Sequence, residues 1–358
     1  MTEWRTTLKR CLWIVSLISL ASSPAIASDH LGVSVDQDQL RFSLVTRNSA
    51  TVLGVDQEGI LVSLWEGDAP ALVDQTADAV TGQLRQSGAR QVAPVRGGFP
   101  QLASLLEIRF SDGVRGTRLR YVTHQVQEGG DSPELRITLE DSERNFQVVL
   151  GFRVHPELDL IERWAEVENR GDSVVTLEKL ASASLVLDRG SYDLLHASGR
   201  WGQEFNIERT TLTGGSKVLE VRGQRFHHLS PWYMVRPSGE SEEESGRVWF
   251  GSLAWSGNWR LEFEKTPEGD LQILGGINFW DSAWTLEPGG RFTSPVLITG
   301  TCAEGPGGAS RRLHRYIRNH VLPEGARERV RPVLYNSWYA TTFGVSDEQQ
   351  VTLAKTAQ

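Results

Sequence analysis

Cysteine is almost absent from this chain, which has only Cys11 and Cys302 among its 358 residues. Cys11 lies in an N-terminal segment that we expect to be removed, so Cys302 is left alone and no disulfide within the chain is predicted. A large hydrophobic core must then stabilise the fold. The roughly 330 residues that remain are enough for one large domain or two ordinary ones.

Long apolar segments are also missing. The chain begins with three basic residues among its first ten, an apolar run at 11–21 and the small residues AIA at 25–27. This is the three-part pattern of a secretory signal peptide, and it predicts residues 1–27 as the signal, cleavage after Ala27 and a secreted or periplasmic protein. The run is too short to cross a bilayer, although an uncleaved anchor is the alternative reading.

Clusters of positive charge are lacking, and the formal net charge is −8. This composition disfavours nucleic acid and anionic membranes as partners and favours a neutral substrate.

The chain is rich in tryptophan, with twelve indole rings. Indoles stack on the apolar faces of sugars, which favours a carbohydrate ligand, although any single tryptophan is more often a packing residue.

Several catalytic and cofactor motifs are absent. No G-x-S-x-G elbow, phosphate-binding loop or dinucleotide fingerprint stands at a strand-to-helix turn. His227 and His228 are neighbours, so on a strand they would point to opposite faces and could not easily share a metal. A lone cysteine gives no Cys-based zinc site. We therefore predict no metal and no cofactor.

Alternating apolar and polar residues run from about residue 31 to 301, with breaks at Gly, Asp, Asn and Pro, as at 135–139 and 152–154. Residues 163–169, 170–173 and 174–177 are typical of a strand, a tight turn and a strand. Helical periodicity of comparable strength is missing there, so we predict a mainly β fold, a large antiparallel sandwich. The acidic residues 240–244 are expected in a solvated loop.

The C-terminal part has a different pattern. Residues 305–308 are predicted as a flexible break before a linker helix at 310–321, and the apolar stretch 332–338 as a strand buried in a parallel sheet. The sequence SDEQ at 346–349 fits a capping box at a helix start. This βα unit would be the first of a (β/α)8 barrel, which needs about 250 residues. The chain is therefore expected to be a fragment.

Seven stretches, in order, resemble glycoside hydrolase family 36. They are SGRWGQE at 198–204, LTGG at 212–215, HHLSPW at 227–232, GSLAWSGNW at 251–259, GINF at 276–279, WTLEPG at 284–289 and RPVLYNSW at 331–338. Each one is weak alone, but the ordered set is specific. Upstream the similarity is looser, through residues 59–61 and 65–67.

The resemblance implies a galactose-mutarotase-like β-supersandwich at 29–301, a helical linker at 302–331 and the start of a truncated catalytic barrel at 332–358. It also implies a retaining α-galactosidase acting on terminal α-galactosides of oligosaccharides, as a homo-oligomer, a dimer or tetramer. The family's nucleophile and acid/base are two barrel Asp residues that would follow Gln358. No catalytic residue is therefore assigned in this chain, which alone should be inactive.

Two substrate-binding residues follow from the resemblance. Trp201 occupies the family's Gly-x-Trp-x-x-Glu position, whose indole is offered to the sugar site, often that of a neighbouring subunit. Trp338 would end the first barrel strand, where substrate walls are built. For both, plain packing is the competing interpretation.

The chain departs from the family where Tyr339 replaces a common Glu and where HHLSP stands at 227–231. An upstream Asp that contacts sugar in some members has no clear match, and Asp74 is only a guess. Substrate choice stays open. The alternatives are a non-catalytic carbohydrate-binding β-sandwich and a family 36 α-N-acetylgalactosaminidase or galactosyl transferase. The buried strand predicted at 332–338 argues against the first.

Overall fold

The computed structural model describes residues 31–69, 90–96, 103–223, 228–239 and 242–357. The predicted signal peptide, Asp74 and His227 lie outside the described residues. The chain divides into two units after Arg312, within a helix, and each unit is described by itself.

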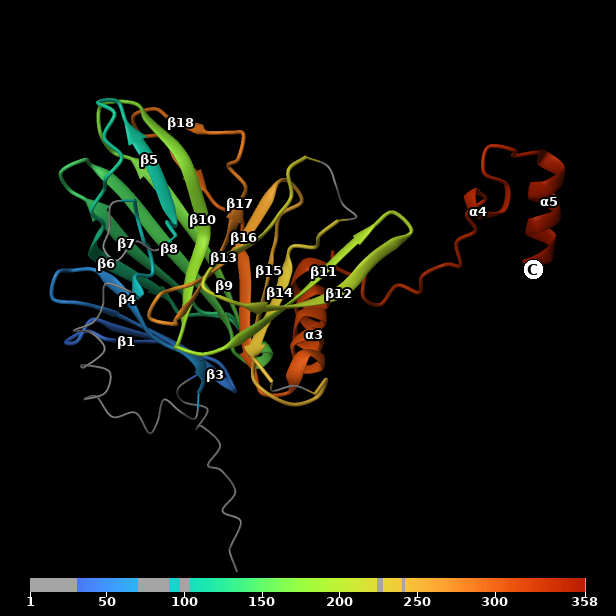
Figure 1. Ribbon diagram of the computed structural model, residues 1–358, viewed down its shortest axis with the longest axis horizontal. Helices are drawn as coiled ribbons and strands as arrows, with labels where there is room; N and C mark the ends of the chain where they lie inside the picture. The colour runs from blue at the N-terminus through green and yellow to red at the C-terminus, as the bar shows by residue number, and fades with distance from the viewer. Residues whose placement is uncertain (1–30, 70–89, 97–102, 224–227, 240–241, 358) are drawn as a thin grey trace, which may run out of the picture. The chain divides into compact units, whose positions relative to one another are not determined.

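Three antiparallel sheets form the first unit (Figure 1). The ten-stranded sheet has the order β12-β11-β14-β15-β20-β9-β8-β7-β6, with β19 paired to β9. Its strands are β6 (Arg120–Gln127), β7 (Glu134–Asp141), β8 (Phe146–His155), β9 (Leu160–Asn169), β11 (Tyr192–Arg200), β12 (Gln203–Leu212), β14 (Trp232–Pro237), β15 (Val248–Leu253), β19 (Arg291–Thr293) and β20 (Leu297–Cys302). The short 3-10 helix η3 (Pro156–Leu158) joins β8 to β9.

The other two sheets are smaller. The six-stranded sheet runs β13-β16-β17-β10-β18, with β5 also paired to β10, and the four-stranded sheet runs β1-β2-β3-β4. The strands of the six-stranded sheet are β5 (Leu106–Phe110), β10 (Val175–Leu187), β13 (Gly215–Glu220), β16 (Trp259–Lys265), β17 (Leu271–Ile277) and β18 (Trp284–Leu286). Those of the four-stranded sheet are β1 (Gly32–Asp36), β2 (Arg41–Val45), β3 (Ser49–Val55) and β4 (Leu61–Asp68). The predicted antiparallel supersandwich is confirmed.

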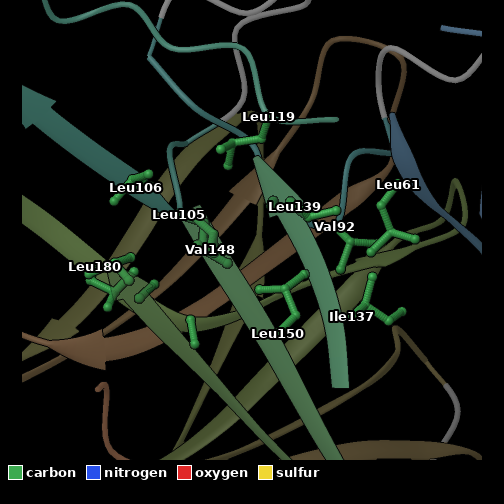
Figure 2. Close-up of a cluster of buried hydrophobic side chains, with 14 of the residues drawn as sticks. Leu61, Val92, Leu105, Leu106, Leu119, Ile137, Leu139, Val148, Leu150 and Leu180 are labelled. Carbon is green, nitrogen blue, oxygen red and sulfur yellow. The ribbon is translucent and has the colours of Figure 1, made fainter. Parts of the chain in front are cut away.

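Two hydrophobic clusters between the large sheets form the core. One contains Ile137 and Leu150 from the ten-stranded sheet and Leu180 from the six-stranded sheet, together with Leu61 from the four-stranded sheet (Figure 2). The second joins residues such as Leu194 and Tyr233 to Phe263 and Ile273. The period-2 alternation of the strands places these side chains on the inner faces, as the sequence pattern predicts.

The segments at 163–169 and 174–177 are strands, but they do not form a hairpin. The first lies in β9, which pairs with β8, β20 and β19, whereas the second lies in β10, which pairs with β17, β18 and β5. The turn between them therefore carries the chain from one sheet to the other. Sequence pattern cannot separate these outcomes, because a tight turn serves both a hairpin and a sheet-to-sheet corner.

One buried ion pair and one buried, hydrogen-bonded carboxylate attach the four-stranded sheet to the sandwich. Arg163 of β9 donates to both carboxylate oxygens of Glu66 on β4, each at 2.9 Å, and also to Thr299 of β20 at 2.9 Å. Asp159 accepts hydrogen bonds from Thr46 Oγ1 at 3.0 Å and from the backbone N–H of Asn48 at 2.8 Å, both in the β2–β3 turn. The same carboxylate pairs with a helix that follows the sandwich.

That helix, α3 (Gly305–Tyr316), begins five residues earlier than predicted and continues as a π-helical turn, η4 (Ile317–Val321). The predicted flexible break at 305–308 is instead its first turn. A Cβ on Gly305 would lie 2.5 Å from the carbonyl oxygen of Glu243, and one on Gly307 would lie 2.6 Å from Glu244 Oε1. The glycines thus permit close packing against the acidic loop rather than flexibility, and Pro306 suits a first helical turn.

The second unit corrects another prediction. Residues 332–337 form no strand, and Val333 and Leu334 are almost fully exposed. A buried parallel strand needs flanking strands, and no described strand pairs with this stretch. Helices α4 (Trp338–Thr341) and α5 (Asp347–Thr356) follow, and the cap of α5 is confirmed, since Ser346 Oγ accepts from the backbone N–H of Gln349 at 3.4 Å.

Cys302, at the end of β20, is a buried free cysteine. Among the described helices, none combines the length and the apolarity that crossing a bilayer requires.

Candidate functional site

The hairpin of β11 and β12 carries Trp201 at its tip. Arg200 pairs with Gln203, so the connection is a two-residue turn, and Gly202 takes the positive φ of 77° that a side chain would resist. The strand β12 is exposed along most of its length, and the hairpin extends from the sandwich as the yellow-green arm in Figure 1. Trp201 is 75% exposed. Its indole is therefore available to a ligand rather than used in packing.

A buried carboxylate fixes the base of this hairpin. Asp193 of β11 accepts hydrogen bonds from Arg209 Nε at 2.9 Å, Thr211 Oγ1 at 2.8 Å and Ser238 Oγ at 3.0 Å. Burial alone would raise the pKa of Asp193, but these hydrogen bonds outweigh it and hold the pKa below its ordinary value. The arm is thus anchored by a charged group that stays ionised near neutral pH.

Further aromatic residues follow Trp201 along the arm. Phe205 is 59% exposed, has a positive φ of 63° and lies 5.8 Å, between ring centroids, from Trp232 of β14. A bulky residue in the left-handed region is uncommon and is held there only by its surroundings. The arm therefore presents two rings, those of Trp201 and Phe205, to the solvent, and its sequence alone identified only Trp201.

His196 belongs to β11 of the arm, and its imidazole is almost fully buried. Neither ring nitrogen has a hydrogen-bond partner among the described residues, and Nε2 is 3.8 Å from Glu208 Oε2. Burial lowers the pKa of His196 below its ordinary value because it penalises the charged ring, an effect that Glu208 opposes and Lys217 reinforces. We expect a neutral imidazole at pH 7.

Trp338 lies in the second unit, so the structure places the two predicted substrate-binding residues in different units. It begins α4, is 44% exposed and stacks edge-on against Phe343 at 4.9 Å between ring centroids. Its backbone N–H donates to Asn336 Oδ1 at 2.9 Å. Because the predicted strand is not formed, Trp338 is not at a strand end, and its predicted role in the substrate wall stays a prediction.

The chemistry offered by the first unit is that of binding. Within the part of the chain that the structure describes, no group of three or more His, Cys, Asp or Glu side chains could hold a metal ion. The arm offers exposed rings, hydroxyls and amides beside charged side chains such as Arg200 and Glu204, and exposed rings suit stacking on the apolar faces of a sugar. A supersandwich with such an arm, followed by a helix, is an architecture found in glycoside hydrolases.

Comparisons with known proteins agree with this class. The model of the glycosyl hydrolase family 36 N-terminal domain matches residues 55–287, and the melibiase model matches residues 291–358. The chain therefore belongs to glycoside hydrolase family 36, as its ordered motifs predicted.

Relatives of known activity support the assignment. The chain is 29% identical to alpha-galactosidase AgaA of Geobacillus stearothermophilus over 75% of its own length and 39% of that protein. It is 32% identical to the bifunctional alpha-galactosidase/sucrose kinase AgaSK of Mediterraneibacter gnavus over 70% of this chain and 28% of that protein. The solved structure of an AgaA variant in complex with raffinose has a TM-score of 0.81 at 26% identity, covering 88% of this chain and 48% of that one. The chain thus spans less than half the length of these relatives.

Proposed function

We propose that this chain is the N-terminal part of an exported, retaining α-galactosidase that removes terminal α-galactosyl residues from oligosaccharides such as raffinose. The observation that carries the proposal is that the two family models match in order, the sandwich first and the start of the melibiase region directly after it. Relatives named alpha-galactosidases supply the substrate class, and variants of one of them, AgaA, have been solved with raffinose and with stachyose.

Within that enzyme the sandwich would contribute binding rather than catalysis. Trp201 stands free at the tip of a rigidly anchored arm, and an exposed indole suits stacking on a galactosyl ring. The protruding arm also suits the completion of a sugar site on another subunit, so we propose a homo-oligomer. Trp338 is proposed to join the substrate wall once its segment pairs with further barrel strands.

The test begins with the gene downstream of the codon for Gln358. We expect the reading frame to continue for about the 250 residues that a barrel needs. The encoded protein should release galactose from raffinose, with the galactose appearing first as the α-anomer by NMR. A stop codon at this point, or no galactose release by the longer protein, would contradict the proposal.

In the same protein, Trp201→Ala should lower kcat/KM about tenfold, mainly by raising KM, because the indole binds substrate and takes no part in bond cleavage. Trp284→Ala is the matched control, since this ring is also exposed, at 54%, but packs against Phe292 on β19. Equal kinetics for Trp201→Ala and the wild type would exclude the binding role. Export is checked by N-terminal sequencing of the secreted protein, which should begin at Ser28.

A further inference from the structure

A pocket of about 530 Å³ opens beside the β11–β12 arm, near the end that carries the turn, and nothing in the proposed function uses it. Its walls come from the segment after β13, the residues before β14 and the β15–β16 loop. The arm adjoins it directly, because Ser198 of β11 forms a β-bridge with Leu229, one of the lining residues. The volume falls in the range of about 300–1,000 Å³ that is typical of small-molecule sites.

The indole of Trp255 forms one wall of the pocket. Trp255 is 42% exposed and lines the pocket. A Cβ on Gly257 would lie 2.7 Å from Trp255 Nε1, so only glycine lets the loop backbone pass this close to the ring. The loop backbone therefore lies against the Nε1 edge of the indole, and the exposed part of the ring is left for a ligand to stack on.

Polar groups without charge complete the lining. Asn258 Oδ1 accepts from the backbone N–H of Gly223 at 2.7 Å, which fixes the amide and leaves Nδ2 free to donate to a ligand. The hydroxyls of Ser230 and Ser256 also line the pocket. None of these three groups has a hydrogen-bond partner in the described residues, and no charged side chain is among the lining residues.

We propose that this pocket binds one pyranose unit of a neutral oligosaccharide, stacked on Trp255 and hydrogen-bonded to Asn258. A charged ligand would lose its hydration without gaining an ion pair, whereas sugar hydroxyls match the free amide and hydroxyls. The pocket requires neither a catalytic carboxylate nor Trp201. Only the choice of a galactose-containing probe rests on the proposed function.

The test uses the 358-residue chain and saturation-transfer-difference NMR with raffinose, with maltose as a galactose-free neutral probe and galacturonate as a charged one. We expect raffinose to bind in the millimolar range, and Trp255→Ala to weaken it about tenfold. Asn258→Ala should weaken it less, because one hydrogen bond is lost and stacking is kept. Trp284→Ala, at an exposed ring outside the pocket, should bind as the wild type does. Circular dichroism melting confirms that each variant folds.

Two results would overturn the proposal. One is raffinose binding that Trp255→Ala leaves unchanged while Trp201→Ala removes it, which would place the sugar on the arm and leave the proposed function intact. The other is the absence of saturation transfer from the folded wild-type chain to either neutral sugar, or a stronger signal for galacturonate. The two proposals can also fail separately. If raffinose binding depends on Trp255 but the longer protein does not cleave raffinose, the sugar-binding role of the pocket is supported and the α-galactosidase proposal is rejected.

Discussion

The ion pair between Arg312 of α3 and Asp159 should be among the most costly to break in the molecule. Arg312 is 4% and Asp159 3% exposed, and Arg312 Nε and Nη2 donate to Asp159 Oδ2 at 3.1 and 2.9 Å. Burial opposes the charge of Arg312, but hydrogen bonds to Glu304 and Asp159 outweigh it and raise its pKa. Arg312→Met would keep the apolar stem and leave the carboxylate buried without a cation. The expected loss of unfolding free energy is about 3–5 kcal/mol.

The neighbouring pair on the same helix is the control. Arg311 bonds Glu244 at 2.7 Å, but both side chains are more than half exposed, so water and salt screen the pair and Arg311→Met should change stability little. Urea unfolding followed by circular dichroism measures both variants. Adding Asp159→Asn to Arg312→Met should restore part of the loss, since it removes the uncompensated charge and Asn tolerates the positive φ of 55° at this position. Equal losses for Arg312→Met and Arg311→Met, or no recovery in the double variant, would refute this reasoning.

Two further predictions concern the sheets. Folding lowers the pKa of His196 from its ordinary value of 6.5. As the pH falls through 6.5, the unfolded chain therefore binds more protons at this residue than the folded chain does, and the free energy of unfolding should decrease between pH 7.5 and 5.5. His196→Gln should show a smaller fall in urea titrations at these two pH values, and an unchanged difference would contradict the role of His196. A Cβ on Gly151 would lie 2.1 Å from the Trp164 ring, so Gly151→Ala should cost about 1–3 kcal/mol by overpacking, while Gly116→Ala, with open space around it, should cost little. A Gly151→Ala protein as stable as Gly116→Ala would show that the ring moves aside freely.

The candidate site was partly predictable. Trp201 was assigned because an ordered set of motifs surrounds it; its ring is exposed at a hairpin tip, and its binding role stays a prediction. Phe205 and Trp255 were not assigned, since an aromatic residue in a strand-rich sequence is more often buried than exposed. The walls of the Trp255 pocket come from three segments between residues 221 and 259, and only the pairing of their strands brings them together.

Both errors in the predicted elements arise because contacts with distant segments, which local sequence does not show, decide the structure. The strand expected at 332–338 requires neighbours that the described chain does not provide, so its apolar residues alone could not make it form. The glycines at 305–308 were interpreted as a break, whereas their function is close approach to the acidic loop, a contact between residues about 60 positions apart.

Properties that depend on local pattern could be inferred from the amino-acid sequence: antiparallel strands from period-2 alternation, the cap of α5 at Ser346, and the family from its ordered motifs. The pairing of strands into sheets, the burial of charged residues such as Arg163 and Arg312, and the exposure of particular rings became known only from the folded chain. The physical reason is that local periodicity assigns each side chain to a face of its strand, whereas burial and pairing depend on what distant segments place against that face.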